Sequence, residues 1–233
     1  MINFEVIATG STGNAVTIDD GHILIDCGIP YSHLRPHIDN LRLVLLTHEH
    51  GDHFHPSAVR ALHRERPALR WGCCEWMVPH LLAAGVDKRV IDVYDIGQSY
   101  LYEFLCGHPF LRSSTEDLTR LVTIKPVRLV HNVPNCGYKI ELGYERLFYA
   151  TDTGTLDGIE AEGYDLYLIE ANHTRAELDA RIQEKEAAGE YAYEREAARN
   201  HLSQEQALDW LAENMGPKSR YVFLHQHKPR EKE

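Results

Sequence analysis

Residues 47–53 (THEHGDH) constrain this chain more than any other stretch, because they place three histidines and Asp52 within a few positions. The apolar run at residues 41–46 (LRLVLL), directly before them, predicts a short buried strand. The cluster therefore lies where a strand ends and a loop begins, which is a usual place for catalytic groups on a rigid scaffold.

The spacing of this cluster favours metal binding. Imidazole nitrogen and carboxylate oxygen are ligands that suit zinc, manganese or iron. Alternate side chains of an extended backbone share a face, so His48 and His50 can bind one ion together. Gly51 allows a turn, after which Asp52 and His53 can face a second ion. One loop histidine is more often solvated than bound, but H-x-H-x-D-H after a buried strand favours a metal site.

Length, composition and charge narrow the class of protein. The 233 residues suit one large domain or two small ones, and a hydrophobic fraction of 43% is ordinary for a globular protein. The net charge of -11 argues against a long nucleic-acid groove lined with Lys and Arg. It does not exclude a small anionic substrate, because bound metal ions are the largest local charges in a site.

The cysteine pattern predicts a reducing compartment, and therefore the cytoplasm. The five cysteines are odd in number and form no C-x-x-C; they are Cys27, Cys73, Cys74, Cys106 and Cys136. The first residues lack a basic region followed by an apolar core, so we expect no signal peptide. No apolar run approaches the roughly 20 residues needed to span a bilayer, so we expect no membrane partner.

Blocks of strands and helices alternate along the chain and predict an α/β fold. Strands are expected at residues 4–9, 15–18, 22–25, 41–46, 90–94, 121–130, 137–142, 146–150, 166–169 and 221–224. Helices are expected at 55–66, 75–84, 174–200 (divided at Gly189) and 203–215. Pro126 suggests an edge or a bulge in its strand. We expect a single domain over residues 1–233, with two mixed sheets packed between helices in four layers and a helical insertion at about 174–200.

Three further polar side chains lie just past expected strands, as the histidine cluster does. They are His131, Asp152 and His225. Each is a weak signal alone, because a histidine at a strand end is more often a surface residue. Together with the opening cluster they supply seven candidate ligands, which is enough for two ions.

The order of these motifs resembles that of the metallo-β-lactamase-fold hydrolases. The matching motifs are residues 23–28 (ILIDCG), 47–53, His131, 150–154 (ATDTG) and His225. The resemblance implies that one ion is held by His48, His50 and His131 and the other by Asp52, His53 and His225. It further implies that Asp152 bridges the two ions and that Asp26 lies close behind the ligand histidines. Two divalent ions are expected as cofactors, zinc before manganese.

Two other motifs resemble the YycJ-like and ribonuclease Z-like phosphodiesterases. They are residues 8–14 (ATGSTGN) and 200–207 (NHLSQEQA), and residues 168–173 (LIEANH) resemble a glutamate motif of ribonuclease Z-like enzymes. The resemblance implies that Glu170 orients His201 and that His201 faces the scissile phosphate. Asp52, His201 and Glu170 are therefore the expected catalytic residues. The alternative is that His201 only flanks a helix and Glu170 is only a charge at a strand end.

The sequence lacks two insertions that related enzymes use, and this narrows the class of substrate. Only 20 residues separate His131 from Asp152, which leaves no room for the extra domain of the β-CASP enzymes. We see no Gly- and Lys-rich arm of the kind that ribonuclease Z uses to hold tRNA. Residues 174–200 carry seven acidic and five basic residues, a poor grip for a polyanion. They are expected to form a lid or a dimer contact, or else a solvated helix pair.

A compact acidic chain of this branch resembles the phage anti-Pycsar phosphodiesterases. That resemblance implies a homodimer that hydrolyses cyclic nucleotide monophosphates to nucleoside monophosphates. One alternative is an RNA or DNA nuclease of the YycJ or ribonuclease Z type. Another is a glyoxalase II-like thioester hydrolase, against which the His201–Glu170 pair and the lack of a C-terminal substrate domain count. A non-catalytic binding module would have lost ligands, whereas all seven positions are filled.

Overall fold

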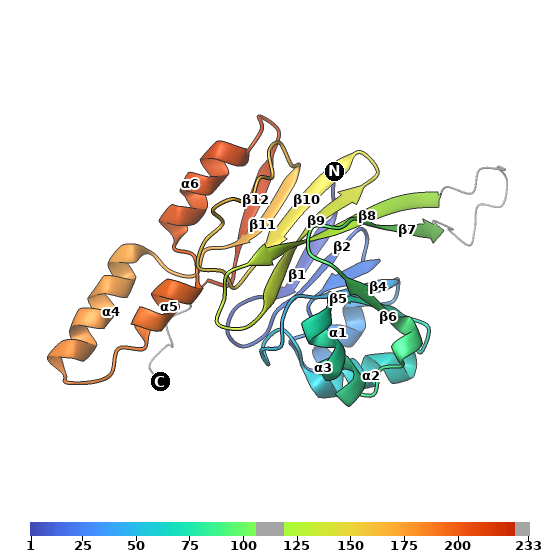
Figure 1. The fold of residues 1–233 in the computed structure, drawn as a ribbon, viewed down its shortest axis with the longest axis horizontal. Coiled ribbons are helices and arrows are strands. Elements are labelled where there is room, and N and C mark those ends of the chain that lie inside the picture. Colours follow the sequence, from blue (N-terminus) through green and yellow to red (C-terminus); the bar gives the residue numbers. More distant parts are fainter. Residues whose placement is uncertain (106–118, 227–233) are drawn as a thin grey trace.

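Two six-stranded sheets packed face to face form the centre of the computed structural model, which describes residues 1–105 and 119–226 (Figure 1). The first sheet has the order β1-β2-β3-β4-β5-β6, at Phe4–Ala8, Ala15–Ile18, Ile23–Ile25, Leu43–Leu46, Arg70–Cys74 and Ile91–Tyr94. The second has the order β12-β11-β10-β9-β8-β7. Strands β7 to β12 are Tyr100–Leu105, Thr119–Leu129, Asn135–Leu142, Glu145–Ala150, Leu166–Glu170 and Arg220–Leu224.

Both sheets are mixed, and their parallel strands fix where the chain can present polar groups. In the first sheet β3, β4, β5 and β6 run parallel, and in the second β10, β11 and β12 do. Ile25 pairs with Leu45, so the residues that follow β3 and β4 emerge at one edge. Glu170 pairs with Leu224, so the ends of β11 and β12 also lie side by side. The polar segments expected just past the strands are thereby brought to shared sheet edges.

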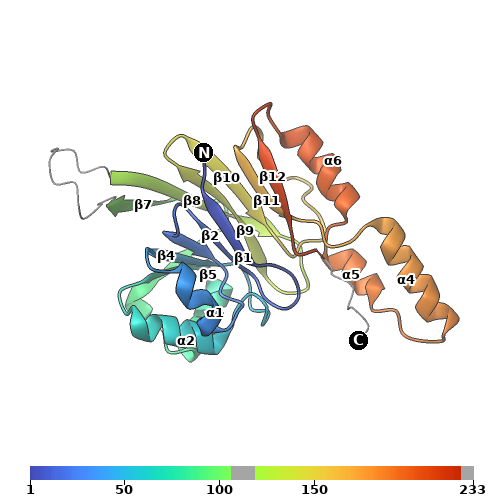
Figure 2. The same cartoon turned by 180° about the vertical axis from the view of Figure 1, so that it is seen from behind.

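Helices cover the outer face of each sheet, which makes four layers (Figures 1 and 2). The α-helices of the described residues are α1 (Tyr31–Leu34), α2 (Pro56–Glu65), α3 (Val78–Ala83), α4 (Arg175–Ala187), α5 (Glu194–Asn200) and α6 (Gln204–Asn214). One apolar cluster fills the space between the sheets. A second lies between the first sheet and α1 to α3, and a third lies under α6. Each fully buried large aliphatic or aromatic side chain there stabilises the fold by roughly 1.5–3 kcal/mol.

The α/β expectation of two mixed sheets between helices is confirmed, with differences in individual elements. Strands β5 and β7 were not expected from the sequence. The helix expected at residues 75–84 begins with a 3-10 turn at Glu75–Met77 and continues as α3. Pro79 lies in the first turn of α3, where a missing N–H costs nothing. β8 pairs with β7 only as far as Ile124, so Pro126 lies past the end of the neighbouring strand, as expected for an edge.

The segment at residues 174–200 forms two helices, α4 and α5, that project beyond the sheets (Figure 2). Gly189 lies between them with a φ of 70°, which is the left-handed conformation expected of a glycine that ends a helix. Cys27, Cys73, Cys74 and Cys136 are buried and free, and Cys106 lies outside the described residues. In the described ranges, none of the helices has the length and apolar character needed to cross a membrane.

Candidate active site

The first set of expected ligands converges at the edges where β4, β8 and β10 end. The Nε2 atom of His48 lies 3.1 Å from Nδ1 of His50, and Nε2 of His131 lies 3.3 Å from the same atom. Oδ2 of Asp152 lies 3.5 Å from Nε2 of His48 and 3.6 Å from Nε2 of His131. We call these four residues the first donor set. One ligand atom from each lies within 4.8 Å of all the others, so the set could hold a metal ion.

The second donor set consists of Asp52, His53, Asp152 and His225 and has the same compactness. Oδ1 of Asp152 lies 3.4 Å from Nε2 of His53 and 3.4 Å from Nε2 of His225. Oδ2 of Asp52 lies 3.3 Å from Nε2 of His225. The two oxygens of Asp152 therefore face different donor sets, the arrangement that a bridging carboxylate needs.

Asp26 fixes which nitrogen of two histidines faces the site. Nδ1–H of His53 donates to Oδ2 of Asp26 at 2.7 Å. The hydroxyl of Thr47 donates to Asp26 at 2.9 Å, so it accepts from Nδ1–H of His48, 3.0 Å away. Both rings therefore present Nε2 without a proton to the donor sets, since the far nitrogen fixes the tautomer. The expectation that Asp26 lies behind ligand histidines agrees with this placement.

The outer nitrogens of the other rings are also held. Nδ1–H of His131 donates to the backbone oxygen of Asn200 at 3.0 Å. Nδ1 of His225 lies 3.4 Å from Oε1 of Glu170 and 3.1 Å from the side-chain nitrogen of Asn172. His131 and His225 are therefore oriented from α5 and from the end of β11, respectively, and both point Nε2 inward.

The donor chemistry fits a divalent cation. Nε2 of His48 and Nε2 of His131 both carry lone pairs and both face Nδ1 of His50, at 3.1 and 3.3 Å, so a proton on that one atom could satisfy only one of them. A cation among the three nitrogens would satisfy all of them. Oδ1 of Asp152 is buried and accepts no hydrogen bond from the described residues. Burial lowers the pKa of His225, but the charge of Asp152 and the contacts with Asp52 and Glu170 together outweigh it and raise the pKa to about 10. This anionic, desolvated pocket therefore attracts positive charge, as a metal site does.

Backbone geometry at three site residues is strained. Asp26, Asp152 and His225 have φ values of 61°, 56° and 52°, which residues other than glycine seldom adopt. Each comes just after a strand, where the left-handed turn folds the side chain back toward the sheet edge. Such conformations cost about 1–3 kcal/mol each and persist where the surroundings over-determine them. Among the described residues, the other two non-glycine residues with positive φ are Asp19 and Asp20, in the turn between β2 and β3.

Glu170 and His201, expected as a catalytic pair, lie beside the second donor set. Oε1 of Glu170 accepts a hydrogen bond from Nδ1–H of His201 at 2.5 Å. The ring of His201 stacks on that of His225, with centroids 5.2 Å apart and planes 6° apart. Burial raises the pKa of Glu170, but the charge of His201 and the hydrogen bonds from His201 and His225 together outweigh it, so the net pKa is lowered. His201 thus presents its other nitrogen next to both donor sets.

Three loops are tied together beneath the second donor set. The backbone oxygen of Asp52 accepts from the backbone N–H of Asn14 at 2.6 Å, and the backbone oxygen of Asn14 accepts from Gly28 at 3.0 Å. A Cβ on Gly28 would lie 1.7 Å from the backbone oxygen of Asp52, so only glycine permits this approach. Sequence reasoning assigned no role to Asn14, although it ends the ATGSTGN motif. It also assigned no role to Asn172, although this residue lies in the LIEANH motif.

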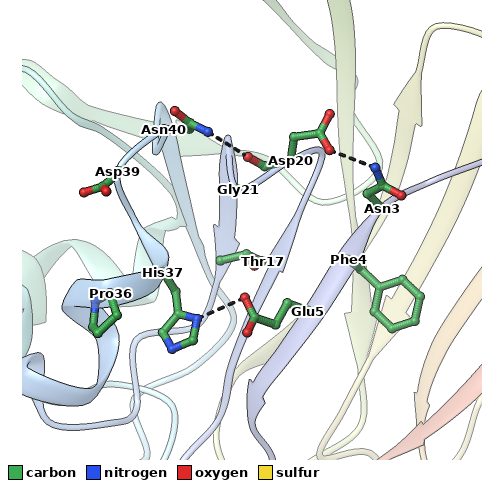
Figure 3. Close-up of a pocket in the computed structure, with 10 residues that line it drawn as sticks. All are labelled: Asn3, Phe4, Glu5, Thr17, Asp20, Gly21, Pro36, His37, Asp39 and Asn40. Carbon is green, nitrogen blue, oxygen red and sulfur yellow. Dashed lines mark hydrogen bonds and ion pairs between the residues drawn. The ribbon is translucent and has the colours of Figure 1, made fainter.

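A hollow of ≈ 340 Å³ lies away from these residues, among β1, β2 and the 3-10 turn at Arg35–His37 (Figure 3). It is lined by the acidic side chains Glu5, Asp20 and Asp39, and Glu5 pairs with Nδ1 of His37 at 3.0 Å. None of the residues of the two donor sets lines it. This hollow therefore has no part in the chemistry described above.

A family model described as a beta-lactamase superfamily domain matches residues 22–226. The chain belongs to this family. The match spans most of the sequence and includes every residue of the two donor sets, together with Glu170 and His201. The expectation of a metal-dependent hydrolase of the metallo-β-lactamase fold is thereby confirmed.

Similar proteins agree with the family and with the fold. The exodeoxyribonuclease WalJ of Streptococcus pneumoniae is 23% identical over 238 residues, which cover 95% of this chain and 80% of WalJ. Human tRNase Z, short form, superposes with a TM-score of 0.66 at 16% identity and covers 97% of this chain and 93% of its own. Zn²⁺-bound PqqB from Methylobacterium extorquens gives a TM-score of 0.62 at 14% identity, over 97% and 89% of the two chains.

Proposed function

We propose that this superfamily hydrolase is a two-metal phosphodiesterase whose substrates are nucleotides. The observation that carries the proposal is the position of the Glu170–His201 pair beside the two donor sets. A site with metal ligands alone would serve many hydrolytic reactions. A histidine held by a buried carboxylate next to those ligands adds a group that can transfer a proton to a leaving alkoxide.

The residues of the chain have distinct roles in this proposal. The first donor set would hold one ion, the second would hold the other, and Asp152 would contribute an oxygen to each. When bound, such ions supply a water whose pKa falls from 15.7 to about 7 and neutralise charge on the phosphodiester. Nδ1–H of His201 donates its hydrogen bond to Glu170. Nε2 of His201 is therefore the atom that would contact the leaving oxygen. The buried Asp26, through Thr47 and His53, keeps the ligand rings in place.

For the substrate, we propose a cyclic nucleotide monophosphate, which is opened to a nucleoside monophosphate, as in the phage anti-Pycsar enzymes that the sequence resembles. A net charge of -11 supports a small substrate, because a polyanion would be repelled along most of the surface. The segment that forms α4 and α5 carries seven acidic and five basic residues, so it offers no excess of positive charge to a polyanion.

A nuclease is the second candidate, because two of the similar proteins, WalJ and tRNase Z, carry names that refer to DNA and tRNA. The chemistry of the site would be the same, and only the contacts outside the donor sets would differ. Salt dependence discriminates between the two candidates. Binding of a polymer releases many counterions and weakens steeply with salt, whereas binding of a mononucleotide does so far less.

We also propose that residues 1–233 form one domain and that the chain is a homodimer. The connection between α4 and α5 supports the second proposal, since it exposes Tyr191 and Tyr193 to 74% and 56%. Light scattering on the wild type and on a Tyr191→Ser, Tyr193→Ser double variant tests it. A dimer that the double variant converts to monomer supports this contact, and a monomeric wild type contradicts the proposal.

The decisive experiment is a substrate panel with two metals. Cyclic mononucleotides, short RNA, single-stranded DNA and a glutathione thioester are assayed with zinc and with manganese, and products are identified by chromatography. We expect cyclic mononucleotides to give nucleoside monophosphates and Asp152→Ala to be inactive. Turnover of polymers alone would favour the nuclease, turnover of the thioester alone would refute the phosphodiesterase, and activity of a metal-verified Asp152→Ala preparation would refute the two-metal site.

A further inference from the structure

Asn14 reaches the second donor set from a loop that carries none of its ligands. Its side chain is 1% exposed, and its Oδ1 accepts from the backbone N–H of Gly10 at 2.9 Å. The side-chain nitrogen donates to the backbone oxygen of Gly10 at 3.1 Å and to that of Asp52 at 3.2 Å. These bonds fix which end of the amide faces the site, because a flipped amide would place oxygen against the two carbonyl oxygens.

The amide nitrogen of Asn14 also contacts two proposed ligands. It lies 3.3 Å from Oδ2 of Asp52 and 2.9 Å from Nε2 of His53. Nδ1–H of His53 donates a hydrogen bond to Asp26. Its Nε2 therefore carries a lone pair and accepts a hydrogen bond from the amide of Asn14. One buried N–H₂ group is therefore aimed at two of the atoms that the second ion would use.

The first donor set has no equivalent contact. Over the described part of the chain, the hydrogen-bond and ion-pair contacts of the inward nitrogens of His48, His50 and His131 are with one another and with Asp152. An ion in this set would therefore displace no contact with a described side chain from outside the set. The two donor sets are thus alike in ligand chemistry and different in what surrounds it.

We propose that Asn14 is a positioning residue for the second metal ion. The amide would leave Nε2 of His53 to an ion bound there, and its bonds to Oδ2 and to the backbone oxygen of Asp52 hold that carboxylate in place. We expect the loss of this hold on Asp52 to outweigh the lone pair that it frees on His53. This inference rests on the proposed two-metal site. It has two consequences: the first donor set fills before the second, and the second depends on Asn14 while the first does not.

Metal titration of the full-length protein tests this proposal without reference to activity. Apoprotein is titrated with zinc against a chromophoric competitor, and bound metal is counted by mass spectrometry. For the wild type we expect two ions, of which the first binds more tightly. Asn14→Ala should bind the first ion as the wild type does and the second about 10–100-fold more weakly, which is the usual effect of losing a partner of a ligand.

Asn214→Ala is the matched control. Asn214 is also buried and also bridges backbone groups, since it accepts from the N–H of Ala161 at 2.8 Å and donates to the oxygen of Trp210 at 3.0 Å. It contacts neither donor set, so its loss should lower the melting temperature and leave both zinc affinities unchanged. This control separates a structural loss from a change in metal binding, and thermal melting of both apoproteins shows that they are folded.

Three outcomes would overturn the role of Asn14. In the first, Asn14→Ala binds the second zinc ion with the affinity of the wild type. In the second, it binds that ion more tightly than the wild type does. In the third, zinc affinity falls equally at both donor sets and the melting temperature of Asn14→Ala lies below that of Asn214→Ala. A wild type that binds fewer than two ions overturns the two-metal proposal as well. The experiment therefore distinguishes a wrong role for Asn14 from a wrong two-metal function.

Discussion

Glu170 joins His201 to the loop that carries Asp152. One carboxylate oxygen accepts from Nδ1–H of His201 at 2.5 Å, and the other accepts from the backbone N–H groups of Thr153 at 3.0 Å and Leu202 at 3.3 Å. A single buried side chain therefore sets the position of the proposed proton donor relative to the carboxylate that faces both donor sets. The resemblance implied the pairing of Glu170 with His201. The hydrogen bond from Thr153 to Glu170 is a further contact that it did not imply.

Glu170→Gln tests whether both oxygens of this carboxylate are needed. The amide has one acceptor atom, so one of the present donors would face an N–H₂ group. We expect unfolding free energy to fall by about 1–3 kcal/mol, the cost of an unsatisfied buried group. Turnover should fall as well, since His201 loses its anion. Chemical denaturation and steady-state kinetics measure the two effects, and an unchanged kcat would contradict the positioning role.

His201→Ala should separate proton transfer from metal binding. We expect kcat to fall about 100- to 10,000-fold, which is the usual contribution of a positioned acid or base. Metal content should stay at the wild-type value, because the proposed ligands do not include His201. His37→Ala is the control, since this partly exposed histidine pairs only with Glu5 away from the site. Loss of metal from His201→Ala would mean that His201 is a ligand.

Chelation should lower thermal stability. Ions that bind only the folded protein stabilise it by about 2.7 kcal/mol when their free concentration is 100 times Kd. For a protein of this size, 1 kcal/mol corresponds to about 2–4 °C in Tm. Each ion therefore corresponds to about 5–10 °C and two ions to about 10–20 °C, and we expect the melting temperature to fall by the latter amount in EDTA and to recover with zinc. Calorimetry provides the measurement, and Asp152→Ala, which lacks the bridging carboxylate, should show a smaller shift.

Gly154→Ala should disturb the contact between the Asp152 loop and the end of α5. A Cβ on Gly154 would lie 2.0 Å from the backbone oxygen of Arg199, so one of the two segments must shift. We expect a loss of about 1–3 kcal/mol in stability, as for other overpacked sites. Gly216→Ala is the control, because its Cβ would meet its nearest neighbour at 3.5 Å. Equal stability of the two variants in denaturant titration would contradict this close approach.

The buried thiols of the native protein should resist alkylation, and the stability of the fold should fall at high pH. Burial raises the pKa of Cys27 and of Cys73 from 9.0 to about 12. Iodoacetamide at pH 8 should therefore label these thiols only after denaturation, as peptide mass spectrometry can show. The unfolded thiols ionise near pH 9 and the folded ones near pH 12, so unfolding free energy should fall between these pH values. Rapid labelling of either cysteine in native protein would contradict its burial.

Most strands could be predicted from apolar runs, and the exceptions have physical reasons. β5 (Arg70–Cys74) is short, contains Gly72, and lacks a clear alternation of polar and apolar residues. Gly72 is needed there because a Cβ would lie 2.2 Å from the hydroxyl oxygen of Tyr94. β7 (Tyr100–Leu105) follows a turn at Asp95 and Gly97, a signal that sequence reasoning did not use. Neither the order of strands nor their register follows from local sequence, since both depend on pairings between distant segments.

The seven expected ligands lie together because each follows a strand that reaches the same end of a sheet. Strand ends are visible in sequence, so the ligands could be found there. The partners of the ligands act across 27 to 69 residues of chain, so local sequence does not give them. The bond of His53 to Asp26 was expected only from the resemblance, and that of His131 to the backbone of Asn200 was not expected. A backbone oxygen leaves no sequence signal. The contacts of Asn14 are visible only once the loops are packed together in the structure.

Each sheet is built from one continuous stretch of chain, residues 4–94 and then 100–224, and both donor sets draw on both sheets. During synthesis the first donor set is complete once Asp152 has been added, whereas the second waits for His225. At about 5–20 residues per second, the ribosome needs roughly 4–15 s to make the chain between these two residues. A nascent chain would therefore carry the proposed ligands of the first ion several seconds before it carries those of the second.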